Sequence, residues 1–355
     1  MSDSPGATYR SAGVDIDASD YLLRAVAPAI ARTQSERVLR GVGHFGGFYR
    51  IGPAGEGLTL VASIDGVGTK LKIAALADRH DGIGHDIVNH CVNDILACGA
   101  RPICFLDYFA TGRLNPEVAR VVIEGIAAAC EAQGIALLGG ETAEMPGIYQ
   151  GDDYDVAGVI LGLVEQDEIV DGTGIRDGDV LIGLQSAGFH TNGYSLIRAS
   201  LVLNEDEGSA RTRLDAPLPW DASRTFAEAL LEPHRSYLGA VSGAIKSGAV
   251  QGMAHITGGG IAGNLGRIIP SDLTAVVDTA TWEAPRLMEY IAELGHVETE
   301  ECYRVFNMGI GFVLVSRPDQ ADSLLESIEG SRLIGEVVSS GGDNRVQMVM
   351  DSSRR

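Results

Sequence analysis

The chain has 355 residues and a formal net charge of −21, which disfavours extended nucleic-acid or anionic membrane surfaces because both need a basic face on the protein. Its 45% of hydrophobic and 21% of charged residues are ordinary for a globular protein, and its length predicts about two domains. Because no apolar run approaches the roughly 18 residues of a membrane span and the first residues show no basic-then-apolar signal pattern, we expect a cytoplasmic protein with neither a membrane nor a nucleic-acid partner.

The first half of the chain predicts a mixture of strands and helices. Residues 1–50 have an irregular pattern apart from a helical patch at 21–32. Beyond them the pattern predicts helices at 69–77, 85–100 and 115–134, and strands at 57–63, 102–109, 135–140 and 153–165. The helix at 115–134 has the clearest ends, because Asn115 suits an N-cap, Pro116 a first turn and Gly134 a stop.

The stretch 171–179 carries turn residues without a core pattern, so we expect a domain boundary there, between 1–170 and 171–355. The second half predicts strands at 180–186, 250–256, 273–278, 311–316 and 333–338, and helices at 194–203, 237–246, 285–294, 318–329 and directly after 257–260. Residues 204–225 are expected to form an exposed loop. Since both halves mix strands with helices, the fold class is α/β or α+β.

The cysteine pattern indicates neither a disulfide framework nor a zinc site. The number of cysteines is odd and none forms a C-x-x-C pair; they are Cys91, Cys98, Cys104, Cys130 and Cys302. We expect buried, reduced thiols.

Acidic residues from separate predicted elements form a candidate magnesium site. Asp65 follows the strand at 57–63, Glu141 follows the sequence LLGG, and Asp94 lies on the polar stripe of the helix at 85–100 beside Asn93. Mg²⁺ binds one or two carboxylates together with waters and substrate phosphates, which fits such a set. Taken singly, each acid could equally be a helix cap or a solvated side chain.

The sequence SIDGVGTK at 63–70 combines an acid, two glycines and a lysine at the end of a predicted strand. It differs from the usual phosphate loop, which reads G-x-x-x-x-G-K-[ST]. Gly66 and Gly68 would allow a close approach of the backbone, and Lys70 could reach a phosphate as a point charge. The alternative is a surface lysine on the first turn of a helix, a position that the helix dipole disfavours.

The sequence SAGFHTNGYS places His190, Thr191 and Asn192 between a predicted strand and a predicted helix. No apolar periodicity surrounds His190, so we interpret it as a candidate for acid–base work or for a phosphate hydrogen bond. The glycines at 258–260 could hold an anion through backbone N–H groups, or could simply form a tight turn. His255 is a weaker candidate.

Ten motifs together resemble the phosphoribosylformylglycinamidine cyclo-ligase family, the aminoimidazole ribonucleotide (AIR) synthetases of purine biosynthesis. They occur in the family's order, and the resemblance extends from about Tyr9 to the last strands near 350. The motifs are GVDIDASD (13–20), GVGHFGG (41–47), DGVGTKLK (65–72), CVNDILACGARP (91–102), FLDYFATG (105–112), LGGETAEMPGIY (138–149), DYDVAGV (153–159), GFHTNGYSL (188–196), HITGGG (255–260) and FNMGIG (306–311).

The resemblance implies an ATP-dependent ring closure. Formylglycinamidine ribonucleotide and ATP would give 5-aminoimidazole ribonucleotide, ADP and phosphate. ATP would phosphorylate the formamide oxygen, the amidine nitrogen would attack that carbon, and phosphate would leave as the ring closes. Mg²⁺ and cations would stabilise the charge on the transferring phosphoryl group.

The resemblance also implies two α/β domains. Strands of the N-terminal, ATP-binding domains of two subunits would form a barrel in a homodimer, and the C-terminal domain would be sandwich-like. It implies Asp65, Asp94 and Glu141 as metal ligands and the following residues near Mg-ATP: Asp65, Gly66, Gly68, Thr69, Lys70, Asn93 and Glu141. The substrate would contact His190, Thr191, Asn192, Gly258, Gly259 and Gly260, and the residues implied in catalysis are His190, Asp94 and Lys70.

Other members of the same superfamily remain alternatives. Formylglycinamidine ribonucleotide synthetase is longer and carries a glutaminase region, and selenophosphate synthetase needs a reactive N-terminal cysteine, whereas the first cysteine here is Cys91. Thiamine-monophosphate kinase is the nearest alternative, but the motifs GGETAEMPG and GFHTNGYSL favour the cyclo-ligase. A non-catalytic nucleotide-binding protein is a further alternative, and consumption of ATP together with the ribonucleotide would distinguish the two.

Overall fold

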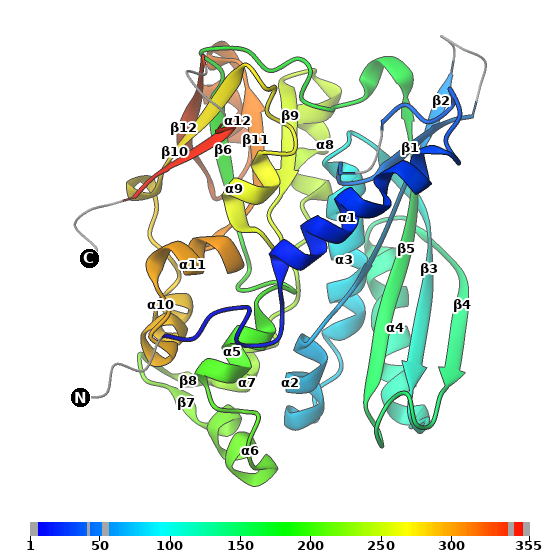
Figure 1. Ribbon diagram of the computed structural model, residues 1–355, viewed down its shortest axis with the longest axis vertical. Coiled ribbons are helices and arrows are strands. Elements are labelled where there is room, and N and C mark those ends of the chain that lie inside the picture. Colours follow the sequence, from blue (N-terminus) through cyan, green and yellow to red (C-terminus); the bar gives the residue numbers. More distant parts are fainter. Residues whose placement is uncertain (1–5, 41–42, 52–56, 340–343, 351–355) are drawn as a thin grey trace.

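The computed structural model describes residues 6–40, 43–51, 57–339 and 344–350. Two sheets dominate these residues, and Figure 1 shows them on opposite sides of the molecule with helices between and below them. One sheet has five strands and the other six, and a two-stranded hairpin is separate from both. The expected two-part mixed α/β architecture is confirmed.

The five-stranded sheet has the order β1-β2-β5-β3-β4. Only the β3–β4 pair is parallel. The strands are β1 (Gly47–Arg50), β2 (Leu58–Gly66), β3 (Arg101–Thr111), β4 (Ala136–Glu144) and β5 (Tyr154–Glu165). Helices α3 (Ile83–Leu96) and α4 (Pro116–Ala132) pack on one face of this sheet.

The local sequence determines where α4 begins and how closely α3 and α4 pack. The side chain of Asn115 accepts hydrogen bonds from the N–H groups of Glu117 and Val118, which confirms the expected N-cap of α4. The two helices approach closely at Gly84, where an added Cβ would lie 2.2 Å from the backbone nitrogen of Ile126. Glycine at this position therefore sets the distance between the helices.

The other face of the five-stranded sheet, called here the uncovered face, exposes large apolar side chains within the described ranges. Ile64 pairs with Val159, which pairs with Leu106, so these three residues share that face. Ile64 is 69% exposed and Leu106 36% exposed. Glu141 pairs with Tyr108 on the same face, and Tyr108 is also partly exposed.

The six-stranded sheet has the order β13-β10-β12-β6-β11-β9 and is antiparallel except for the β10–β13 pair. All seven residues of β11 are buried. The strands are β6 (Val180–Gln185), β9 (Val250–His255), β10 (Leu273–Asp278), β11 (Ile310–Ser316), β12 (Ser331–Ser339) and β13 (Val346–Val349).

The remaining helices and the hairpin connect or flank the two sheets. They are α1 (Ile16–Ala31), α2 (Lys70–Ala77), α5 (Tyr194–Ser200), α6 (Glu207–Asp215), β7 (Pro217–Leu218), β8 (Asp221–Thr225), α7 (Phe226–Leu230), α8 (Leu238–Lys246), α9 (Gly260–Leu265), α10 (Arg286–Gly295), α11 (Thr299–Val305) and α12 (Pro318–Ser327). Two short 3₁₀ turns complete the described elements, at Gln166–Glu168 and Thr279–Thr281.

The expectation of an exposed loop at 204–225 is wrong. This stretch contains α6 and the β7–β8 hairpin. Asp206 caps α6 by accepting a hydrogen bond from the N–H of Ser209, and the helix buries Ala210 and Leu214. Two buried side chains in nine residues give too weak a period to stand out from a polar sequence.

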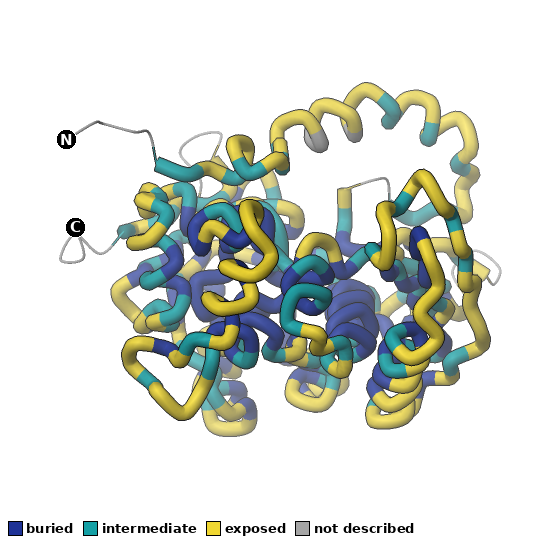
Figure 2. The backbone as a smooth tube through the Cα atoms, turned by 90° about the horizontal axis from the view of Figure 1, so that it is seen from below, coloured by how far each residue is buried: buried dark blue, intermediate teal, exposed yellow. Residues whose placement is uncertain are grey.

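The N-terminal segment runs across to the second domain. The backbone N–H of Ala7 donates to the carbonyl of Gly295, and Asp17 pairs with Arg304 at 2.6 Å. Helix α1 then stands away from the buried interior, as the exposed arch in Figure 2 shows. None of the helices in the described ranges is long and apolar enough to cross a membrane.

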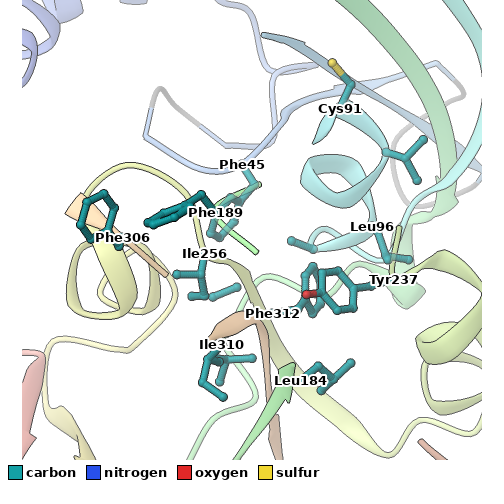
Figure 3. Packing of buried hydrophobic residues seen from close by; sticks show 14 of the residues in the cluster. Phe45, Cys91, Leu96, Leu184, Phe189, Tyr237, Ile256, Phe306, Ile310 and Phe312 are labelled. Carbon is teal, nitrogen blue, oxygen red and sulfur yellow. The ribbon is translucent and has the colours of Figure 1, made fainter. Parts of the chain in front are cut away.

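The two domains share a continuous core. Figure 3 shows Leu96 of α3 beside Tyr237 and Phe312 from the second domain, and these side chains belong to one buried cluster. Polar contacts reinforce the junction. Asn93 of α3 donates to the carbonyl of Arg235 at 2.8 Å and accepts from the backbone N–H of Tyr237 at 2.9 Å.

A buried ion pair also lies at this junction. The ammonium of Lys70 is 2.8 Å from the carboxylate of Asp86, and both side chains are fully buried. Lys70 also donates to the carbonyl of Glu232, and Asp86 accepts from the backbone N–H of His234. Burial lowers the pKa of Lys70 and raises the pKa of Asp86, while their mutual attraction opposes both shifts.

We predict that Lys70→Met destabilises the protein by about 3–5 kcal/mol, because it leaves the buried carboxylate of Asp86 without a cation. The matched control is Lys72→Met on the same helix. Lys72 is 44% exposed and pairs with Asp153, so its removal should cost less than about 1 kcal/mol. Urea unfolding followed by circular dichroism measures both values, and equal midpoints for the two variants would contradict this account of the junction.

Candidate functional site

A cavity of about 370 Å³ opens where the two domains meet. The N-terminal domain contributes the end of β2 and the turn that follows it, and the second domain contributes the segments before α5 and α9. Among the described residues that line it there is no lysine or arginine. The lining residues are Tyr9, Val14, Asp65, Gly66, Val67, Gly68, Thr69, His90, Thr191, Asn192, Tyr194, Ser195, Thr257 and Gly258.

The turn after β2 presents a carboxylate to this cavity. Asp65 is the penultimate residue of β2, and its side chain is 43% exposed. Its Oδ1 accepts a hydrogen bond from the N–H of Gly66 at 2.7 Å. Gly68 has a φ of +71°, a conformation that favours glycine, and allows the chain to turn into α2. The hydroxyl of Thr69 lies 3.0 Å from that of Ser195 across the domain junction.

His90 of α3 is the closest charged neighbour of Asp65. Its Nε2 lies 2.7 Å from Asp65 Oδ2, and its Nδ1 lies 2.7 Å from the hydroxyl oxygen of Thr191. Burial opposes the charge on His90, but the attraction of Asp65 outweighs burial and raises the pKa of His90 to about 9. Burial likewise opposes the charge on Asp65, yet His90 lowers the pKa of Asp65 to about 2. The two groups therefore form an ion pair near neutral pH.

Asp94 lies behind this pair in contact with a second histidine. Its Oδ1 is 2.8 Å from His255 Nδ1, and its Oδ2 accepts from the hydroxyl of Ser63 at 3.1 Å. His255 Nε2 is 3.0 Å from His234 Nε2, and His234 Nδ1 is 3.3 Å from the hydroxyl oxygen of Thr191. Burial lowers the pKa of His255 and of His234, so both are neutral.

These contacts form one chain of polar groups from Asp65 to Asp94. We assign the protons from the requirement that each neutral imidazole carries a single N–H. The charged His90 donates to Thr191, whose hydroxyl donates to His234. His234 then donates through Nε2 to His255, and His255 donates through Nδ1 to Asp94. Each side chain in this hydrogen-bonded series is thus oriented by its neighbours, and the series includes residues of both domains.

The interpretation of His190 as a substrate-handling residue is not supported by its position. His190 is fully buried, accepts from the N–H of Ala187 at 3.1 Å and stacks on His234 with ring centroids 4.0 Å apart. Burial lowers its pKa well below the usual value. Its φ of +58° turns the chain so that Thr191 and Asn192, rather than His190 itself, face the cavity.

Asn192 is well placed for a ligand. Its Oδ1 accepts from the N–H of Gly258 at 3.0 Å, whereas its buried Nδ2 has no hydrogen-bond partner within the described chain. The glycine turn is less available than expected, because Gly258 donates to Asn192 and Gly260 donates to the carbonyl of Thr257. Gly260 also sits where an added Cβ would lie 1.8 Å from the carbonyl oxygen of Tyr303. Close packing therefore explains this glycine.

Three other predicted residues lie away from the cavity. Lys70 is fully buried in its ion pair with Asp86, so it has no free donor to direct at a phosphate in the cavity. The side-chain amide of Asn93 is hydrogen-bonded to the backbone of Arg235 and Tyr237 in the second domain. Glu141 lies on the uncovered face of the five-stranded sheet, across β5 and β3 from β2, so within one subunit it does not join Asp65 and Asp94.

Sequence patterns alone do not predict that His90, His190, His234 and His255 lie together. His90 and His255 lie beside predicted acids and glycines, but nothing in the sequence around His234 marks it as functional. His234 reaches the site because the loop before α8 packs against α3. The five cysteines are free and buried, as expected.

The donor set fits a divalent metal ion and a phosphorylated ligand. Asp65 and Asp94 offer carboxylate oxygens, and hydroxyls and backbone N–H groups line the cavity. A phosphate bound here would need a metal ion, because the lining residues named above include no lysine or arginine and the charge of His90 is paired with Asp65.

Two family models match the chain. The model described as AIR synthase related protein, N-terminal domain, matches residues 43–164, and the model described as AIR synthase related protein, C-terminal domain, matches residues 176–347.

Curated relatives agree with these models. A phosphoribosylformylglycinamidine cyclo-ligase of Trichlorobacter lovleyi is 44% identical over 98% of this chain and 99% of its own. One of Myxococcus xanthus is 47% identical over 92% of this chain and 93% of its own.

Solved structures support the fold. The structure of AaThiL complexed with AMPPCP and TMP has a TM-score of 0.64 at 14% identity, covering 94% of this chain and 95% of that one. Thiamine-monophosphate kinase from Stenotrophomonas maltophilia K279a has a TM-score of 0.59 at 18% identity, covering 92% and 95%. The two domain models and the curated relatives together show that this chain belongs to the AIR synthase related family, as a relative of the phosphoribosylformylglycinamidine cyclo-ligases.

Proposed function

We propose that this chain catalyses the ATP-dependent cyclisation of formylglycinamidine ribonucleotide to 5-aminoimidazole ribonucleotide, with release of ADP and phosphate. The observation that carries the proposal is the identity of 44% with a named cyclo-ligase over 98% of this chain. The cavity between the domains supports it, because the carboxylate of Asp65 and the unpartnered amide nitrogen of Asn192 lie there within the described chain.

The reaction activates a poor leaving group. The γ-phosphoryl group of ATP moves to the formamide oxygen, forming one P–O bond and breaking that to ADP. The amidine nitrogen attacks the formamide carbon and loses a proton, the C–O bond breaks, and phosphate leaves with the oxygen. Ring closure needs the nitrogen and the carbon held in contact, which is a task of positioning.

The residues of the cavity can be assigned parts in this reaction. Asp65 and Asp94 would hold Mg²⁺, which supplies charge neutralisation at the phosphoryl group. Asn192 directs a free N–H at the ligand, and the hydroxyl of Thr69 lies at the wall beside it. Positioning by Asn192 and exclusion of water by the domain junction are the contributions of the chain itself.

We also propose a homodimer formed through the uncovered face of the five-stranded sheet. That face exposes large apolar side chains on adjacent strands, and contiguous patches of this kind are typical of interfaces. The exposed residues are Tyr49, Leu58, Ile64, Leu106, Tyr108 and Leu138. A part for Glu141 in metal or nucleotide binding would require this second subunit, since Glu141 lies on the same face.

Two further assignments belong to this proposal. The boundary between an ATP-binding N-terminal domain and the C-terminal domain is placed at 170/171, between β5 and β6. We place the enzyme in the cytoplasm, because five free cysteines are typical of proteins kept in a reducing compartment.

The function is tested by supplying purified protein with ATP, Mg²⁺ and formylglycinamidine ribonucleotide and measuring ADP and aminoimidazole ribonucleotide together. Equal amounts of both, formed only when both substrates are present, are expected. ADP formed with thiamine monophosphate as acceptor in place of the ribonucleotide would instead favour the kinase, and nucleotide binding without turnover would overturn the enzymatic proposal.

We predict that Asp65→Asn lowers kcat/KM by at least about 100-fold, because it removes a charged ligand from the phosphoryl-transfer site. The fold should survive, since the substitution is isosteric and the side chain is partly exposed. Asp167→Asn, an exposed acid after β5, is the matched control and should leave kcat/KM unchanged. Full activity of Asp65→Asn would refute the metal role.

We predict that Asn192→Ala lowers kcat/KM by about tenfold or more, because the side chain supplies a donor to the ligand and orients the turn at Gly258. Steady-state kinetics against the ribonucleotide at saturating ATP measures this effect. A loss confined to the KM for ATP would assign Asn192 to the nucleotide instead.

We predict that Leu106→Asp converts the dimer into a monomer, because it buries a charge at the centre of the proposed interface. Sedimentation equilibrium at micromolar concentration measures the mass. Leu294→Asp, at an exposed leucine of α10 in the second domain, should leave the mass unchanged. A wild-type protein that sediments as a monomer would contradict the proposal directly.

A further inference from the structure

His234 lies at the centre of the polar contacts behind the cavity. It is a buried residue of the loop between α7 and α8. Helix α3 of the other domain holds its backbone. The N–H of His234 donates to Asp86 Oδ1 at 2.7 Å, and its carbonyl accepts from Asn89 Nδ2 at 2.6 Å. The first domain thus fixes where this residue of the second domain lies.

The side chain of His234 contacts two separate segments of its own domain. Nδ1 lies 3.3 Å from the hydroxyl oxygen of Thr191, in the turn after β6. Nε2 lies 3.0 Å from Nε2 of His255, the last residue of β9. Because Thr191 lines the cavity, a single imidazole links the cavity wall to the end of β9.

A neighbouring histidine holds this ring in place. His190 stacks on His234 with ring centroids 4.0 Å apart and 19° between the planes. Burial and the neighbouring imidazoles lower the pKa of His234 well below its usual range, so the ring is neutral, with one nitrogen that accepts and one that donates. Since the stack restricts rotation of the ring, both nitrogen atoms keep fixed directions.

The contact of His234 with Thr191 leads to Asp65. The hydroxyl oxygen of Thr191 lies 2.7 Å from Nδ1 of His90, and Nε2 of His90 pairs with Asp65 at 2.7 Å. Because Nδ1 of His234 accepts the hydroxyl proton of Thr191, the oxygen of Thr191 offers a lone pair to the N–H of His90. His90 is then oriented with its other N–H directed at Asp65.

The contact of His234 with His255 leads to Asp94. The Nε2–H of His234 donates to Nε2 of His255, so the proton of His255 lies on Nδ1, which donates to Asp94 Oδ1 at 2.8 Å. Asp94 Oδ2 accepts from the hydroxyl of Ser63 at 3.1 Å. Both carboxylate oxygens are therefore held in position, and each keeps a further lone pair for a metal ion.

We propose that His234 is a positioning residue of this site, which orients the carboxylates of Asp65 and Asp94 at the same time. It acts through Thr191 toward the first and through His255 toward the second. Partners behind metal ligands fix the directions of those ligands, and their loss typically costs about 10–100-fold in affinity or activity. The effect on turnover rests on the function proposed above, whereas the orientation of the carboxylates does not.

Packing alone does not require an imidazole at this position. A phenylalanine ring would fill a similar space and could stack on His190. An imidazole adds one hydrogen-bond acceptor and one donor, and these are the two groups that reach Thr191 and His255. Substitutions that keep the shape of the ring but change these two groups therefore distinguish positioning from packing.

The test compares three substitutions of His234. His234→Phe keeps the ring but removes both nitrogen atoms. His234→Asn keeps an oxygen that can accept from Thr191, and His234→Gln keeps a donor that can reach His255. We expect kcat/KM for ring closure to fall by about 10–100-fold in His234→Phe. Because each amide keeps one of the two contacts, His234→Asn and His234→Gln should each recover part of this loss.

Binding of Mg²⁺ with the ATP analogue AMPPCP, measured by calorimetry, follows the same effect without turnover. We expect His234→Phe to raise the Kd by about tenfold or more, because the carboxylates lose their orientation. The matched control is Tyr154→Phe. It removes a buried contact of 2.7 Å with another histidine, His80, and neither residue lines this cavity. Its Kd and kcat/KM should equal those of the wild type.

A double-mutant cycle with Thr191→Val tests the route of the effect. If His234 acts through Thr191, the double variant with His234→Phe should lose less activity than the product of the two single losses. Losses that multiply would show two independent effects and would overturn the inference.

Each remaining outcome also decides the inference. Equal Kd and kcat/KM in His234→Phe and the wild type would overturn it, as would losses no larger than the unfolded fraction seen by circular dichroism. If His234→Phe does not fold, the two amide variants replace it, and wild-type values in both would overturn the inference. The expected order of Kd values without ring closure would count against the proposed function alone. Failure of the wild type to bind the analogue would overturn both.

Discussion

The structure depends on the burial of a polar helix face. Helix α3 lies between its own sheet and the second domain, and nearly all of its residues are buried. Yet Asp86, His90, Asn93 and Asp94 recur at the spacing of one helix face. Because a buried polar group without a partner is costly, each of them must find one inside the protein. The partners fix where the second domain sits.

That constraint also places the site. The side chain of Asn93 holds the loop before α8, which brings His234 to the helix, and His234 in turn contacts His255 at the end of β9. The chain of contacts ends at the carboxylates of Asp65 and Asp94, one on the cavity wall and one behind it. The same side chains therefore hold the two domains together and form the site. Separation of the domains would expose these polar groups or remove their hydrogen-bond partners.

Much of the fold could be predicted from the sequence. Some elements are clearly marked by a capping residue or by hydrophobic periodicity, such as α4 after Asn115 and strand β5. For these, the expected and observed bounds differ by at most two residues. The elements that sequence analysis missed are short or mostly exposed, such as β1, α11 and the hairpin at 217–225. Their stability comes from packing against distant segments, which leaves no local period to detect.

The site was predictable only where local sequence sets the geometry. Asp65, Thr191 and Asn192 lie at the cavity because glycine-containing turns end the preceding strands there. The structure places Lys70 and His190 away from the cavity for the opposite reason. The partner of Lys70 in the second domain is 162 residues away in sequence, and His190 is buried by stacking on His234. No pattern around either residue contains that information.

Charge determines how such a site can receive its ligands. The chain carries a net charge of −21, and the described wall of the cavity offers the imidazolium of His90 as its cationic side chain against the carboxylate of Asp65. With Asp94 behind them, the floor has a net negative charge, so a polyphosphate alone would be repelled. A divalent ion reverses that sign. Under the proposed function, we therefore expect binding of the nucleotide in this cavity to be coupled to binding of the metal ion.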